Sequence, residues 1–236
     1  MTALRSFCKF LDDVHLLKIN LLLAFQTAVA PRRKVIFGFT RDEADAILNA
    51  MNKETAKGKR DYAILLLAKK TGLRSGDIVN LQFTNIDWKN DEIHIIQRKT
   101  NRPLILPLEP DVGNAIYAYV LHGRPVAESP YIFLRTLPPY QKLSDHSSSM
   151  NSIICKYMDA VGVSHKPGER KGFHSFRRSL GTWMLENEVP LNTIKEVLGH
   201  SHMNSSRPYL STNLEKLKHC SLSFDGIEVT REELIG

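Results

Sequence analysis

A change of hydrophobic periodicity in the middle of the chain constrains its fold most. Apolar residues recur at helical spacing before residue 81 and after residue 107, whereas the segment between them alternates apolar and polar residues. The alternation is clearest in three runs, at residues 83–88, 93–97 and 104–107, with polar turns between them. The pattern predicts an α+β fold that is mainly helical and contains one small three-stranded antiparallel sheet.

Capping signals place the helices that flank this sheet. Thr40 is followed three residues later by Glu43, which predicts a capping box at the start of a helix. A second helix is expected over residues 60–70, and Gly72 is a typical residue to end it. Arg74 is then expected at the start of a short helix. Further helices are predicted over residues 111–121, 148–160, 175–186, 191–198 and 214–219.

A basic, proline-led stretch at residues 31–35 predicts a linker between two domains. Residues 16–30 are apolar, yet they include Lys18 and are too few to cross a membrane, so we expect a buried helix there. Because about thirty residues cannot form their own core, we expect residues 1–30 to be part of a helical domain. The main domain is expected over residues 36–220, followed by a tail at 221–236.

Charge and cysteine content narrow the class of partner. The 236 residues include 32 Lys and Arg and 25 Asp and Glu, a net charge of +7 that favours a polyanionic partner over an acidic substrate. Cys8, Cys155 and Cys220 are far apart and odd in number. This arrangement argues for a reducing, cytoplasmic location and against a disulfide framework or a structural zinc site.

Six residues in the last two-thirds of the chain suit chemistry on a phosphodiester. Guanidinium groups donate paired hydrogen bonds to phosphate oxygens, histidines donate or transfer protons near neutral pH, and a tyrosine hydroxyl can act as a nucleophile. The candidate catalytic residues are Arg74, Lys99, His174, Arg177, His200 and Tyr209.

The local contexts of these residues resemble the active-site boxes of the tyrosine recombinases, the phage-integrase family. The matching segments are 71–74 (TGLR), 174–177 (HSFR) and 198–201 (LGHS), with Tyr209 nine positions after His200. The resemblance implies that residues 1–30 are the end of a helical core-binding domain and residues 36–220 an integrase-like catalytic domain. It also implies strand exchange between DNA sites through a 3′-phosphotyrosine, without metal or cofactor.

The resemblance assigns a role to each candidate. Tyr209 is the nucleophile, His174 or His200 accepts its proton, and Lys99 protonates the departing 5′-oxygen. Double-stranded DNA is the expected partner, with four protomers assembling on two sites to integrate or excise a mobile element, with or without accessory factors. Residues expected to contact DNA are Arg32, Arg33, Lys34, Arg98, Arg102, Lys171 and Arg178, with Arg124, Arg135, Lys142, Lys166 and Arg170 as further backbone contacts.

Each candidate also has a structural explanation when it is taken alone. Arg74 can pair with Asp77, Lys99 can lie in a solvated cationic turn, and Pro208 before Tyr209 is typical of a helix start in which a tyrosine only packs. The complete set in the family's order favours the recombinase interpretation. Two alternatives remain at this point: a type IB topoisomerase, which uses the same residue set, and a DNA-binding relic without activity.

Overall fold

The computed structural model describes residues 2–14, 38–144, 147–164 and 171–199. The chain divides into two compact units, Met1–Val35 and Ile36–Gly236. In the first unit, helix α1 (Thr2–Asp13) exposes Phe7 and Phe10 and buries Cys8. The helix expected over residues 16–30, the linker at 31–35 and the helix expected over 214–219 lie outside the described residues.

Helix α2 (Arg41–Asn49) opens the described part of the second unit and has the predicted capping box. The Glu43 N–H donates to Thr40 Oγ1 at 3.1 Å, and the Thr40 N–H donates to Glu43 Oε2 at 2.9 Å. These two bonds satisfy backbone donors that have no partner inside the helix. The helix buries Ala44, Ile47 and Leu48 against the core.

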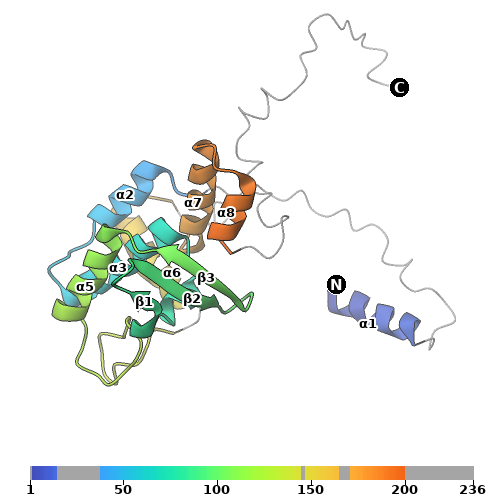
Figure 1. Ribbon diagram of the computed structural model, residues 1–236, viewed down its shortest axis with the longest axis horizontal. Helices are drawn as coiled ribbons and strands as arrows, with labels where there is room; N and C mark the ends of the chain where they lie inside the picture. The colour runs from blue at the N-terminus through green and yellow to red at the C-terminus, as the bar shows by residue number, and fades with distance from the viewer. Residues whose placement is uncertain (1, 15–37, 145–146, 165–170, 200–236) are drawn as a thin grey trace, which may run out of the picture. The chain divides into compact units, whose positions relative to one another are not determined.

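Helix α3 (Ala56–Thr71) is the central helix of this unit. It packs against α5 (Pro110–His122) and α7 (His174–Glu186), as Figure 1 shows. The helix begins at Ala56 rather than at residue 60, because Thr55 caps it and accepts a hydrogen bond from the Gly58 N–H at 3.0 Å. The predicted helix end at Gly72 is confirmed, with φ at +62°.

The predicted three-stranded antiparallel sheet is confirmed, in the order β1-β2-β3. Its strands are β1 (Ile86–Asp87), β2 (Glu92–Gln97) and β3 (Arg102–Pro107). The first strand is shorter than predicted, because residues Phe83–Asn85 form a 3-10 helix. Asn85 Oδ1 accepts a hydrogen bond from the Gln82 N–H at 2.9 Å, and this local bond competes with a strand ladder.

Helices α6 (Ser147–Ala160) and α8 (Leu191–Val197) agree with the predicted ranges to within one residue at each end, as do α5 and α7. The short helix expected to start at Arg74 is α4 (Ser75–Val79), which has Arg74 as its N-cap residue. Helix α6 packs against α2 and α4, and α8 packs against α7 (Figure 1). The fold class is confirmed as mainly helical with one small sheet. Within the described ranges, no helix combines the length and apolar character needed to span a bilayer.

Candidate active site

Arg74 lies at the turn between α3 and α4, where the chain reverses after a left-handed glycine. It is the N-cap residue of α4, but its side chain makes no capping hydrogen bond. Glycine is favoured at position 72, because the φ of +62° disfavours other residues and a Cβ there would lie 2.9 Å from Leu198 Cδ2, which would have to move. The turn therefore sets the position of Arg74, and the guanidinium makes no capping hydrogen bond to α4.

Arg177, on α7, is 3% exposed and joins three elements of the domain. Its Nη1 donates to the Gly72 carbonyl at 2.9 Å, and its Nη2 donates to the Leu198 carbonyl at the end of α8. A guanidinium has five N–H donors in one plane, so these two bonds fix the orientation of the whole group. Arg177 thus fixes the end of α3 relative to the end of α8.

His174 begins α7 and is influenced by several positively charged residues. Desolvation by the surrounding protein, followed by the charges of Arg178, Arg177, Arg74 and Lys99, lowers the pKa of His174 to about 4. Solvent still reaches one side of the residue, which is exposed. The charges come from α7, from the turn before α4 and from the β2–β3 turn, so the structure brings together the four described catalytic candidates. His174 is neutral at pH 7.

Lys99 is exposed in the turn between β2 and β3, as the sequence predicted. The turn is attached to α4 by Asp77, whose Oδ1 accepts a hydrogen bond from the Arg98 N–H at 3.0 Å. Asp77 is 5% exposed, and its Oδ2 has no hydrogen-bond partner among the described residues. The structural alternative for Arg74, an ion pair with Asp77, is absent from the salt bridges between described residues.

The basic residues predicted to contact DNA have different environments. Arg98 and Arg102 are exposed beside Lys99, and Arg178 is half-buried on α7. Lys171 Nζ forms an ion pair with Glu43 Oε1 at 2.6 Å, so it also ties the segment before α7 to α2. Arg124 has a structural role, because its guanidinium donates to the carbonyls of residues 129, 131 and 132 at 2.9 to 3.2 Å.

Several predicted site residues lie outside the described residues. These residues are Arg32, Arg33, Lys34, Lys166, Arg170, His200 and Tyr209. The described chain ends at Gly199, directly before His200, and Arg177 binds the preceding carbonyl of Leu198. The assignment of His200 and Tyr209 to the site therefore remains a prediction.

Sequence reasoning missed one polar residue of this site, Gln97. It is the last residue of β2, fully buried, on the inward face that Ile93 and Ile95 share. A polar residue in phase with buried apolar residues was the signal, because strand side chains alternate between faces. Its contacts with Arg74 and Gly199 are described below.

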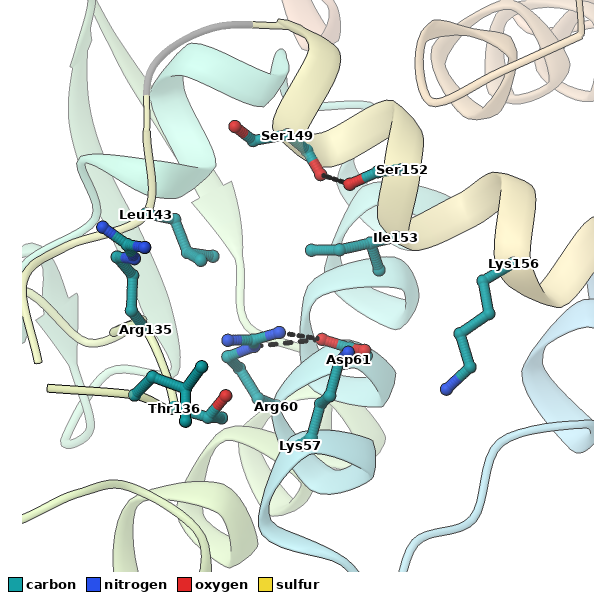
Figure 2. Close-up of a pocket in the computed structure, with 11 residues that line it drawn as sticks. Lys57, Arg60, Asp61, Arg135, Thr136, Leu143, Ser149, Ser152, Ile153 and Lys156 are labelled. Carbon is teal, nitrogen blue, oxygen red and sulfur yellow. Dashed lines mark hydrogen bonds and ion pairs between the residues drawn. The ribbon is translucent and has the colours of Figure 1, made fainter.

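A cavity of about 360 Å³ lies elsewhere, between α3, α6 and the loop that includes Arg135, and none of the catalytic candidates lines it. Figure 2 shows Arg60 paired with Asp61 in this cavity, with Lys57 and Lys156 on the helices that flank it. The Arg60 and Asp61 side chains are 5% and 0% exposed and interact at 2.7 Å. Both residues lie on α3, where Arg60 Nη1 also donates to the Leu134 carbonyl and Asp61 Oδ2 accepts from the Tyr157 hydroxyl of α6, so the pair has a structural role and is not the candidate active site. Among the described residues, no group of three or more His, Cys, Asp or Glu is placed to hold a metal ion.

Two arginines, a lysine and a histidine, gathered from three parts of a helical domain, are residues suited to contact an anionic group such as a phosphodiester. Comparison with known proteins identifies the family. The profile of the Phage integrase family matches residues 38–216. The chain belongs to the phage integrase family, which includes the tyrosine recombinases.

Relatives and solved structures agree with this assignment. The chain is 38% identical over 191 residues to a putative integrase/recombinase, y4gC, of Sinorhizobium fredii, covering 80% of this chain and 96% of that protein. It is 31% identical to a second, y4rF, from the same organism, covering 76% of this chain and 41% of y4rF. It is 26% identical to the tyrosine recombinase XerC of Anoxybacillus flavithermus, covering 94% of this chain and 73% of that one.

Solved structures of integrases and recombinases share the fold. A lambda integrase dimer bound to a core site has a TM-score of 0.65 at 18% identity, covering 96% of this chain and 74% of that one. The XerH recombinase bound to its difH substrate has a TM-score of 0.66 at 16% identity, covering 79% of this chain and 53% of that one.

Proposed function

We propose that this chain cleaves and rejoins DNA at specific sites through a covalent 3′-phosphotyrosine formed by Tyr209. Tyrosine recombinases are DNA breaking and rejoining enzymes, and the family assignment supports the general reaction. One observation carries the proposal for the site: hydrogen bonds tie its basic residues together, because Arg177 binds the Gly72 carbonyl two residues before Arg74, and Asp77 in the following helix binds the Arg98 N–H beside Lys99. That arrangement suits a reaction in which negative charge develops on a phosphate.

The arginines stabilise the transition state of the cleavage step. When the Tyr209 oxygen attacks phosphorus, extra negative charge develops on the two non-bridging oxygens of the five-coordinate phosphate. Arg74 and Arg177 donate hydrogen bonds to these oxygens. Donors aimed at developing charge are each worth roughly 10²–10³-fold in rate, so loss of either guanidinium is expected to affect cleavage far more than DNA binding.

Two proton transfers complete the cleavage step. The phosphorus–O5′ bond breaks as the bond to the tyrosine oxygen forms, and Lys99 gives a proton to the departing 5′-oxygen. The phenol of an ordinary tyrosine has a pKa of about 10, so roughly 0.1% is ionised at pH 7 and a base must assist. A neutral imidazole has a lone pair for that proton, and His174 and His200 are the two candidates to accept it.

Rejoining is the reverse of cleavage on a different strand. The phosphotyrosine bond replaces the phosphodiester bond, and attack by a free 5′-hydroxyl releases Tyr209 without external energy. DNA is held by backbone contacts from Arg98, Arg102 and Arg178, which position the strand but do not read its sequence. The other proposed contacts are Lys171, Arg32, Arg33 and Lys34.

We propose that the reaction serves a mobile element in the cytoplasm, with four protomers assembling on two DNA sites. Similarity to a protein named integrase/recombinase and to a transposon integrase structure solved with DNA supports this role. In this proposal residues 36–220 are the catalytic domain, residues 1–30 belong to a core-binding domain, and 31–35 and 221–236 are the linker and tail.

Covalent capture tests the proposal. The chain and a Tyr209→Phe variant are incubated with nicked DNA fragments of the source genome and denatured, and the DNA that stays attached to protein is sequenced. We expect attached DNA at one locus for the native chain and none for the variant. Attachment scattered over the genome favours a type IB topoisomerase, and no attachment by the native chain favours a DNA-binding relic.

A further inference from the structure

The side-chain amide of Gln97 is buried at the point where three parts of the site meet. Gln97 ends β2, two residues before Lys99, and is 0% exposed. An amide has two donor hydrogens and an acceptor oxygen, and such groups are hydrogen-bonded when buried. Gln97 therefore requires polar partners in the interior.

The surrounding groups determine which way the amide points. With nitrogen and oxygen assigned from the hydrogen-bond network, Nε2 donates to Thr100 Oγ1 and to the Gly199 carbonyl, both at 2.9 Å. Oε1 then accepts from Arg74 Nη1 at 3.3 Å. In the opposite orientation, Oε1 faces the Gly199 carbonyl oxygen and Nε2 faces the Arg74 guanidinium, and both contacts are repulsive. The side chain thus contacts the turn before α4, the Lys99 turn and the residue before His200.

The absence of a side chain at Gly199 leaves room for this amide. Gly199 has φ at +57°, and a Cβ at this position would lie 2.2 to 2.5 Å from the three terminal atoms of the Gln97 amide. The two carbonyls at the end of the described chain have different partners: Leu198 binds Arg177, and Gly199 binds Gln97. The backbone that leads into His200 is therefore held from two sides.

We propose that Gln97 is a positioning residue for strand cleavage, which orients the Arg74 guanidinium and the backbone before His200 together. This inference rests on the proposed function. A neutral acceptor suits the task, because it orients one Nη of Arg74 without neutralising the charge that a phosphate needs. A carboxylate in its place would form an ion pair with Arg74, compete with the phosphate and repel the Gly199 carbonyl.

Two variants separate these effects. Gln97→Met removes the hydrogen bonds at similar volume, and Gln97→Glu keeps the shape but adds a negative charge. The rate of covalent adduct formation on a nicked oligonucleotide carrying the captured site is measured at saturating protein. The DNA dissociation constant and the thermal unfolding midpoint are measured alongside. His94→Ala is the matched control, because His94 lies on the exposed face of the same strand and its side chain bonds to Glu92.

We expect Gln97→Met to slow adduct formation roughly 10- to 100-fold, as expected for a misplaced catalytic group, with the DNA dissociation constant within about threefold of the native value. Gln97→Glu is expected to be slower still, and His94→Ala to match the native chain. A Gln97→Met rate within about twofold of native overturns the proposal. So does parallel loss of rate, DNA affinity and thermal stability, because that pattern indicates a general structural role.

A second measurement keeps this inference separate from the proposed function. In nitrogen-15 NMR spectra, the bond to Gln97 slows rotation of the Arg74 Nη groups, and Gln97→Met should restore fast rotation there but leave Arg177 slow. If the native chain forms no adduct, the proposed function fails. If the Arg74 signals are then unchanged in Gln97→Met, the positioning role fails as well.

Discussion

Removing the carboxylate of Asp61 should destabilise the domain more than any exposed charge change. Asp61 is 0% exposed and lies on α3, the helix whose end presents Arg74. Its Oδ1 accepts from Arg60 Nε at 3.0 Å and from Nη2 at 2.7 Å, and its Oδ2 accepts from the Tyr157 hydroxyl at 3.1 Å. Asp61→Ala leaves the buried Arg60 guanidinium without its counter-ion, and breaking a buried pair in this way costs about 3–5 kcal/mol.

Urea unfolding measures this loss. With an m-value of about 2 kcal/mol per M, a loss of 3–5 kcal/mol lowers the midpoint by about 2 M. Tyr157→Phe removes one hydrogen bond to a charged group and should cost about 1.5–3 kcal/mol. In the Asp61→Ala background the Phe change should cost less, because its acceptor is already gone.

A surface carboxylate provides the control. Asp45 pairs with Lys69, but its side chain is 57% exposed, so Asp45→Ala should change stability by about 0–1 kcal/mol. Equal midpoints for Asp61→Ala and Asp45→Ala would refute the argument from burial. Independent, additive effects of the changes at Asp61 and Tyr157 would refute the hydrogen bond between them.

Three further predictions concern the site. The His174 imidazole should titrate well below pH 6.5 by NMR. Because its pKa is lower in the folded state than in the unfolded state, the stability that the neutral ring contributes above pH 6.5 should be lost as the pH falls toward 4. A titration midpoint of His174 at or above 6.5 would contradict the effect of burial and of the nearby positive charges. Gly72→Ala should lower the free energy of unfolding by about 1–3 kcal/mol through its positive φ, whereas no change would mean that the turn relaxes easily. Arg102→Ala should reduce the slope of log DNA affinity against log salt by about 1, and Lys171→Ala by less because Lys171 is paired with Glu43; equal slopes would argue against that pair in the DNA complex.

Local signals in the sequence were sufficient to predict most of the described fold. The Thr40–Glu43 capping box, the stop at Gly72 and the alternation along β2 are each set by neighbouring residues, and each is confirmed. The first strand was predicted to be longer than it is. It begins only at Ile86, because the Asn85 side chain accepts a hydrogen bond from the backbone of Gln82. Periodicity alone does not reveal such competition between a side chain and a strand ladder.

Long-range contacts within the site were the part that the sequence did not reveal. The bonds from Arg177 to Gly72 and Leu198 join residues that are distant along the chain. The sequence also did not reveal that Lys171 pairs with Glu43 or that the Arg124 guanidinium binds the backbone of a loop. A basic residue looks alike in sequence whether its partner is a phosphate, a carboxylate or a backbone carbonyl, so only the folded structure distinguishes them.

The identity of the residue that carries the DNA tests the central claim most directly. The covalent adduct is digested with a protease and a nuclease, and the peptide that keeps a nucleotide is sequenced by mass spectrometry. We predict that the nucleotide is attached through its 3′-phosphate to the peptide containing Tyr209. Attachment to a different residue, or an adduct that persists in Tyr209→Phe, would contradict the account.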